Sequence, residues 1–449
     1  MTADAISLAA SFFITLLILG LFWIGLRSER LAKIFPTQSE RISSLDGLRG
    51  FLALAVVFSH LLSYRSYLSS GRWDFPNHFF EFAPVTAVQM FFCITGFLFW
   101  SKAIRSKGKT DVGDFYWRRF LRIYPLYFVM VVISVAVLIW TPYGKPASPA
   151  WSDPAKILFP HIPNTEWPHI NGRSPFLTLA QSWTLSFEIG FYALFPLVAW
   201  VFARSLRTFL LFVPLFVAVL IYSVKAPSMQ GFSQCAPFLV GMISAEIVER
   251  RFALDFLRGI GGTILVAVGL GVLYVSHTKI TDVLIILTFA PIAAGNTIFG
   301  VLAWKPCRAL GDISYSVYLI HLAVITILLM AWPLDVAHST TGAFWGFGTT
   351  AVLLSVLASL GTYRVFEEPF MRKKSPKNAK RAPGSALISM LVPDGFFTAS
   401  ACAIALQFAF VRSHPRTSVA TSPTWTGKPQ GVLKTMRQIC EGDPLTICH

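Results

Sequence analysis

Three ionisable side chains, Asp46, Arg49 and His60, share one apolar stretch of the chain. An ionisable group deep in a membrane helix is costly, so it is by default a candidate functional residue. A neutral imidazole shielded from water remains a base at neutral pH and can take a proton from a hydroxyl. We therefore interpret His60 as a candidate catalytic residue, either a base or a nucleophile. The alternative is a structural histidine in a hydrogen bond between helices.

Helix geometry separates these groups into two stations. Arg49 and His60 lie only about 20° apart around a helix axis but about 16 Å apart along it. Asp46 and Arg49 are therefore too far from His60 for a direct hydrogen bond. We predict an entrance near the start of the helix, at Asp46 and Arg49, and a separate reaction point at His60. Taken alone, Asp46 would serve as a helix N-cap and Arg49 as a topology charge.

Two further apolar segments carry groups of the same kind. Glu188 is a lone carboxylate near Ser186, and it needs a partner, for which His60 or an arginine is the natural choice. Tyr315 and His321 lie in the other segment, where hydroxyls equally serve contacts between helices. Ionisable residues in three separate segments predict an enclosed polar cavity.

The composition indicates that these segments are membrane helices. Of 449 residues, 54% are hydrophobic and 13% are charged, and that charged fraction is about half of the soluble average. An all-α, polytopic integral membrane protein is expected. Apolar segments of spanning length fall at roughly 6–26, 47–64, 86–101, 121–140, 180–203, 208–224, 232–248, 259–276, 282–302, 314–332 and 343–366, with a weaker one at 385–411.

The basic residues set the expected topology. With the N-terminus outside, most of the 38 Lys and Arg residues fall in cytoplasmic connections, as the positive-inside rule requires. This distribution explains the net charge of +16 without a nucleic-acid partner. The connection 102–122 is the most basic and is the best candidate for meeting a polyanion. The first segment lacks a basic leader region, so we expect it to remain as an anchor.

The longest external connection, 141–179, is rich in proline and carries Trp167, His161 and His169. A loop of this length is typical of a lid or recognition element. Its aromatic rings and polar donors suit a sugar, and an interfacial aromatic belt is the alternative.

The end of the chain leaves several alternatives open. The stretch 385–411 is broken at Pro393 and Gly395, so it either crosses the membrane once or dips back. A disulfide between Cys440 and Cys448 is expected only if the tail lies outside. The sequence contains no Walker loop, no Gly-x-Ser-x-Gly elbow and no His-Glu-x-x-His pair, so neither a metal nor a nucleotide hydrolase is expected.

Several ordered motifs resemble those of the membrane acyltransferase-3 family. The stretch 45–60 resembles the opening motif of the family, and 91–98 is similar to its Phe-Phe-x-x-Ser-Gly-Phe-Leu motif, with Thr95 in place of the serine. Further matches are the arginine motif at 115–127, the Trp-Ser-Leu-Ser-x-Glu-Glu-x-Phe-Tyr pattern at 183–192, and two late motifs at 313–321 and 366–370.

The resemblance implies roles for particular residues. The histidine of the opening motif is catalytic in the family, a role that transfers to His60. The arginine motif is associated with the acyl donor, which implies that Arg118, Arg119 and Arg122 bind the phosphates of coenzyme A; positive-inside charge explains part of the same cluster. The second glutamate common in the family is absent here, because Ile189 follows Glu188.

The resemblance also implies an architecture. It predicts a ten-helix acyltransferase core over 41–372, preceded by an anchor and linker at 1–40 and followed by a basic segment, a hydrophobic segment and a polar tail at 373–449. Many relatives append a soluble esterase-like domain, and the short tail here predicts a stand-alone form.

We expect the chain to move an acyl group, with acetyl favoured, from cytoplasmic acyl-CoA to a hydroxyl of an envelope or exported glycan. His60 and Glu188 are the expected catalytic residues. Arg49, Arg118, Arg119 and Arg122 are expected to bind the donor, with Asp46, Thr95, Ser186, Tyr315 and His321 in support.

The rival readings are a transporter or flippase and an inactive partner of a glycan synthase. The expected location is the bacterial inner membrane, where lipid surrounds the chain. The sequence also allows a homo-oligomer.

Overall fold

The computed structural model describes residues 3–35, 41–140, 154–163, 165, 167–169, 174–225, 234–275, 284–332 and 335–369. Within these ranges every regular element is helical. Seven helices are long and apolar enough to cross a membrane. The expected all-α, polytopic membrane protein is therefore confirmed. The stretch 385–411, Cys440 and Cys448 lie outside the described residues.

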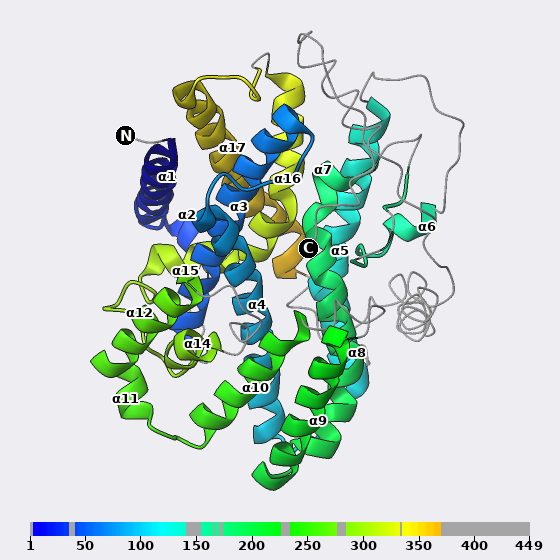
Figure 1. The fold of residues 1–449 in the computed structure, drawn as a ribbon, viewed down its shortest axis with the longest axis vertical. Helices are drawn as coiled ribbons and strands as arrows, with labels where there is room; N and C mark the ends of the chain where they lie inside the picture. The colour runs from blue at the N-terminus through cyan, green and yellow to red at the C-terminus, as the bar shows by residue number, and fades with distance from the viewer. Residues whose placement is uncertain are drawn as a thin grey trace.

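Helix α3, Ser43–Ser70, carries the polar stretch and lies near the middle of the molecule in Figure 1. It is longer at both ends than the predicted span 47–64. Gly71 ends it in a left-handed conformation, with φ of 74°, which a glycine adopts without the strain of a side chain. At the other end a Cβ on Gly47 would lie 1.9 Å from the carbonyl oxygen of Leu302, so α3 packs there directly on a neighbouring backbone.

Four more helices form the side of the bundle that carries the arginine motif. They are α4 (His78–Arg105), α5 (Val112–Trp140), α8 (Trp183–Phe202) and α9 (Leu206–Lys225). Helices α5, α8 and α9 run together along one flank in Figure 1. The short elements α6 (Pro154–Ile157), α7 (Phe176–Leu179) and η1 (Ala180–Ser182) precede α8.

The opposite flank is built from shorter helices. It contains α10 (Ala236–Glu249), α11 (Leu254–Arg258), α12 (Ile260–Val275), α14 (Ile286–Ala293) and α15 (Lys305–Asp312). Helix α10 packs closely on α4, because a Cβ on Gly241 would lie 2.1 Å from the carbonyl oxygen of Cys93. Close packing through glycine is common between membrane helices.

The predicted span over 282–302 is wrong. Helix α14 ends at Ala293, after eight residues, and the chain then turns at Gly295. The side-chain amide of Asn296 donates hydrogen bonds to the carbonyls of Leu257 and Gly259 at 3.0 and 2.9 Å. These bonds tie the chain to the end of α11 instead of continuing the helix, a tertiary contact that hydropathy does not report.

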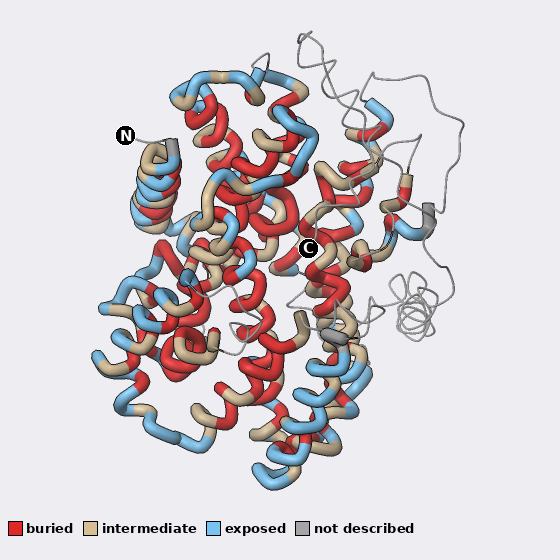
Figure 2. Tube along the Cα trace, in the orientation of Figure 1, coloured by how far each residue is buried: buried red, intermediate tan, exposed pale blue. Residues whose placement is uncertain are grey.

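Helices α16 (Ser314–Ala331) and α17 (Thr341–Thr362) lie beside α3, and α17 continues into a π-helical turn, Tyr363–Glu367. Helix α1 (Ala3–Gly25) lies at the edge of the molecule (Figure 1) and connects through α2 (Glu29–Ala32) to the core. Buried residues fill the interior, whereas large apolar side chains such as Phe13 and Leu211 are exposed on the outside (Figure 2). That distribution suits a protein surrounded by lipid.

Candidate active site

His60 and His321 form a direct pair in the centre of the molecule. His60 comes from α3 and His321 from α16, and Nδ1 of His60 lies 2.9 Å from Nε2 of His321. The ring centroids are 5.1 Å apart, with an angle of 20° between the planes. His321 is fully buried. We call these two residues the histidine pair.

The hydrogen bonds assign the protons of the histidine pair. Nδ1 of His321 lies 3.2 Å from the carbonyl oxygen of Val317, which can only accept, so this nitrogen carries the proton. In a neutral ring Nε2 of His321 is then an acceptor, and Nδ1 of His60 must donate to it. This network leaves the lone pair of His60 on Nε2, the nitrogen that points away from the pair.

A row of aromatic rings leads from His60 to the connection before α7. Trp73, which follows α3, lies 5.7 Å from the His60 ring and 5.2 Å from the Phe176 ring, between centroids. Phe176 lies 5.8 Å from Trp167, and Trp167 stacks on His161 at 3.7 Å. We call Trp73, Phe176, Trp167 and His161 the aromatic row.

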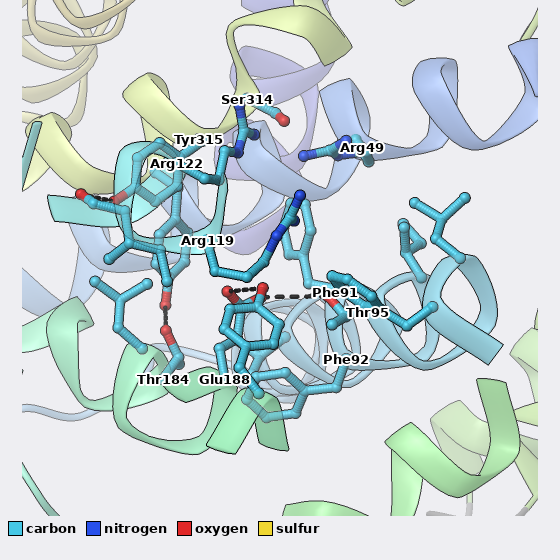
Figure 3. A pocket seen from close by; sticks show the side chains of 18 of the residues that line it. Arg49, Phe91, Phe92, Thr95, Arg119, Arg122, Thr184, Glu188, Ser314 and Tyr315 are labelled. Atoms are coloured by element: carbon cyan, nitrogen blue, oxygen red, sulfur yellow. Dashed lines mark hydrogen bonds between the residues drawn. The ribbon is translucent and has the colours of Figure 1, made fainter. Parts of the chain in front are cut away.

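A separate cavity of about 430 Å³ lies between α3, α4, α5, α8 and α16. Arg49, Arg119 and Arg122 line it together with Glu188 and Tyr315, and Figure 3 shows Arg49 of α3 and the two arginines of α5 directed toward one another. We call this cavity the arginine pocket. The histidine pair is not part of its lining.

The charges in the arginine pocket are only partly paired. Arg122 bonds through Nη1 to Oε2 of Glu367 at 2.9 Å. In contrast, the Nε atoms of Arg49 and Arg119 are buried and have no hydrogen-bond partner among the described residues. Unpaired buried donors of this kind are a ready site for an anion such as a phosphate.

Glu188 is held by two hydroxyl groups in the arginine pocket. Its carboxylate accepts from the Tyr192 hydroxyl at 3.0 Å and from the Thr95 hydroxyl at 3.3 Å. The hydroxyl kept at position 95 therefore has a defined contact. Of the two partners considered from the sequence, the structure brings the arginines, and not His60, into the same cavity as Glu188.

Asp46 pairs with Arg41. Its Oδ1 accepts from Nη2 of Arg41 at 2.8 Å, and Nη1 of Arg41 contacts Asp312 at 2.5 Å. Burial opposes the charge on Arg41, but the two carboxylates outweigh it and raise its pKa above the ordinary value. These two ion pairs, both made by Arg41, therefore tie the N-terminal end of α3 to α15.

Three other predicted residues have different surroundings. Arg118 pairs with Asp114 at 2.7 Å and does not line the arginine pocket. Ser186 donates to the carbonyl oxygens of Pro160 and His161 at 3.1 and 2.6 Å, so it positions the connection before α7. Tyr315 donates to the carbonyl oxygen of Ile123 at 2.9 Å and does line the pocket.

Three site residues were missed by sequence reasoning. Tyr192 and Glu367 stand inside recognised motifs, and their polar groups in apolar runs were the available signal. Trp73 gave no signal, because its contact with His60 depends on how the chain turns back after Gly71. Among the described residues no cluster of three His, Cys, Asp or Glu could hold a metal ion.

Comparison with known proteins supplies the family. A family model described as an acyltransferase domain, the acyltransferase-3 family, matches residues 42–364. Nodulation protein 10 of Rhizobium leguminosarum bv. viciae is 26% identical over 76% of this chain and 96% of its own length. Exopolysaccharide production protein ExoZ of Rhizobium meliloti is 26% identical over 64% of this chain and 89% of its own.

A third relative, acyltransferase MdmB of Streptomyces mycarofaciens, is 33% identical over 36% of this chain, and the match spans 40% of its own length. No solved structure matches the chain. The family model covers most of the core, including the histidine pair and Arg49, Arg119 and Arg122 of the arginine pocket. The chain therefore belongs to the acyltransferase-3 family and is a multi-pass membrane acyltransferase.

Proposed function

We propose that this acyltransferase takes its acyl group, with acetyl favoured, from cytoplasmic acyl-CoA and passes it to a hydroxyl of an envelope or exported glycan. The observation that supports the acyl-CoA donor is a pair of buried Nε donors, on Arg49 and Arg119, that have no hydrogen-bond partner among the described residues and belong to side chains lining one pocket. Such donors favour an anionic ligand, and the phosphates of coenzyme A supply one.

The distance between the two stations also supports acyl-CoA. Helix α3 is continuous from Arg49 to His60, so the two residues lie about 16 Å apart along its axis. A donor with phosphates at one end of a flexible arm and a thioester at the other end matches this separation. The phosphates then lie in the arginine pocket while the acyl carbon reaches the histidine pair.

The histidine pair supports the transfer step. Nε2 of His60 takes the proton of the acceptor hydroxyl while its oxygen attacks the thioester carbonyl. The new C–O bond forms, the C–S bond breaks, and the His60 imidazolium gives that proton to the thiolate, so that ester and free thiol result. In the alternative sequence Nε2 first bonds to the acyl carbon as the C–S bond breaks and the thiolate leaves; the acceptor oxygen then displaces Nε2, and the hydroxyl proton passes to the thiolate.

The aromatic row supports a glycan acceptor. Sugar rings stack on aromatic faces, and the aromatic row joins the connection before α7 to His60, with Trp73 buried beside His60 and Trp167 farther along the row. Two relatives carry names that refer to nodulation and to exopolysaccharide production. We further propose the bacterial inner membrane as the location, with the N-terminus outside, because the basic connections then lie in the cytoplasm.

The test uses the full-length protein in lipid nanodiscs with radiolabelled acetyl-CoA and a panel of envelope glycans. Release of free thiol together with label in one glycan is expected. His60→Ala should remove both, and Arg119→Ala should weaken donor use, whereas Arg118→Ala should have little effect because its pair with Asp114 lies outside the pocket.

Thiol release by folded His60→Ala at the wild-type rate would contradict the proposed role of the histidine. Acceptor movement across the bilayer without any thiol release would instead support transport. Unchanged glycans in cells carrying His60→Ala would point to a non-catalytic partner of another enzyme.

A further inference from the structure

Helix α1, which lies outside the residues matched by the family model, encloses an apolar groove with the core. The groove has a volume of about 840 Å³. Leu8, Phe12, Leu16 and Leu19 form one stripe of α1 along it, and α3, α4 and the segment 299–307 form the other walls. We call this space the apolar groove.

The two hydroxyl groups that line the apolar groove already make hydrogen bonds. The Ser11 hydroxyl donates to the carbonyl oxygen of Ser7 at 2.9 Å, and the Thr15 hydroxyl donates to that of Ser11 at 2.8 Å. A water molecule needs two or more polar partners to be stable in a cavity. Water therefore has little to hold it here, and a hydrocarbon occupant is favoured.

The apolar groove has a buried floor and an open rim. Leu54 and Phe80 on the floor are 2% and 1% exposed, whereas Phe12 and Phe299 on the rim are 60% and 79% exposed. A channel of this shape lets a long apolar molecule lie lengthwise with one side still open to the bilayer.

One wall of the apolar groove contains a strained turn. Ile298, Phe299 and Gly300 have consecutive φ values of 49°, 55° and 88°, and a β-branched residue such as isoleucine rarely adopts this left-handed conformation. Strain of this kind persists where the surroundings impose it, and it is common at binding sites. The turn also reaches the catalytic helix, because Gly47 of α3 packs on the backbone of Leu302.

The length and lining of the groove suit a hydrocarbon chain. From Leu8 to Leu19 the groove runs about 16 Å along α1. An acyl chain lying along this stripe would bury its methylene groups against apolar side chains of α1, α3 and α4.

We propose that the apolar groove binds the acyl chains of one bilayer phospholipid. Helices α1, α3 and α4 are all long and apolar enough to span the membrane, so the groove between them opens to the lipid interior, where phospholipid chains are the abundant ligand. Helix α1 then forms one wall of a lipid site beside α3, the helix that carries Arg49 and His60.

The test uses the full-length protein in vesicles that contain phosphatidylethanolamine with a photoactivatable diazirine in the middle of one acyl chain. After irradiation, peptide mass spectrometry locates the adducts. Labelling on α1 and on 299–304 is expected to exceed that on the exposed face of α9 at least fivefold. Ala83→Trp, which fills the groove, should lower groove labelling at least fivefold, and Leu211→Trp on α9 should leave it unchanged.

Native mass spectrometry provides an independent readout. Wild-type protein and Leu211→Trp should retain one phospholipid after mild detergent extraction, and Ala83→Trp should retain none. If Ala83→Trp fails to fold, Ala55→Phe on the α3 wall replaces it. Groove labelling equal to that of α9, full retention of lipid by the filled variants, or cross-links to a second copy of the chain would overturn the proposal.

Discussion

The arginine pocket and the histidine pair are both built from buried polar groups. They differ in which hydrogen-bonding atoms they leave without a partner. In the arginine pocket, the Nε donors of Arg49 and Arg119 have no hydrogen-bond partner among the described residues. In the histidine pair, each ring makes a hydrogen bond, and one lone pair on His60 remains. The first arrangement suits the binding of an anionic group, and the second suits the acceptance of a proton by His60.

This difference predicts that the two regions fail in different ways. A change in the arginine pocket should raise the KM for the donor, since it removes an interaction made with the bound substrate. A change in the histidine pair should lower kcat, since it removes an interaction needed in the transition state. Variants that reverse this pattern would break the comparison.

The largest expected effect is on His60. His60→Ala removes the base or acyl carrier, and we expect a fall in kcat of about 10³-fold, within the usual range for such groups. Thiol release from acetyl-CoA in the presence of acceptor measures it. His60→Gln serves as a control that keeps a polar side chain. Activity within tenfold of wild type in a folded variant would show that the chemistry lies elsewhere.

The next effect is on Arg119. Losing a charged hydrogen bond to a phosphate costs about 1.5–3 kcal/mol, so Arg119→Ala should raise the KM for acetyl-CoA by about 10- to 100-fold. Initial rates over a range of donor concentrations measure this. The neighbouring Arg118→Ala should change KM less than twofold, because an exposed ion pair contributes little. Equal effects of the two variants would refute a specific donor pocket.

His321 is expected to act by positioning His60. His321→Ala removes the acceptor for Nδ1 of His60, so the catalytic tautomer and ring orientation are no longer fixed. We expect kcat to fall about 10- to 100-fold with little change in KM. His321→Gln can still accept at a similar position and should restore part of the rate. Alanine and glutamine variants with the same rate and the same pH profile would contradict this role.

The smallest effect is expected at the outer end of the aromatic row. Burial lowers the pKa of His161 to about 4, below the ordinary value of about 6.5. The neutral ring stacked on Trp167 therefore stabilises the connection fully above about pH 6.5, and this contribution is lost as the pH falls toward 4.

Backbone hydrogen exchange near His161 should accordingly quicken several-fold between pH 7 and pH 5, after correction for the intrinsic rate. His161→Phe keeps the stacked ring without its charge, so it should not show the change. A pH response of the same size in His161→Phe would exclude this histidine as the cause.

The sequence was informative about single helices and less so about contacts between them. Helix periodicity placed Arg49 and His60 on one face and at two depths, because both follow from the rise of a continuous helix. The pairing of His60 with His321 depends on how α3 meets α16, and no spacing within either segment encodes that distance.

Hydropathy also failed at one element for a physical reason. The segment 282–302 is apolar enough to suggest a span, but Asn296 bonds to carbonyls of α11 and the chain turns. One polar residue with a tertiary hydrogen-bond partner can end a helix, even where the mean hydropathy of its neighbours predicts a membrane span. The role of Asp46 was uncertain for a similar reason, since its partner Arg41 stands outside the apolar run.

Donor binding by variants of the two regions tests the central claim most directly. Calorimetric titration of the protein in nanodiscs with a nonreactive acyl-CoA thioether separates binding from chemistry. We predict that His60→Ala binds this ligand with a Kd within twofold of wild type, while Arg119→Ala binds it at least tenfold more weakly. Equal weakening in both variants, or undiminished binding by Arg119→Ala, would contradict the division between a donor pocket and a reacting histidine.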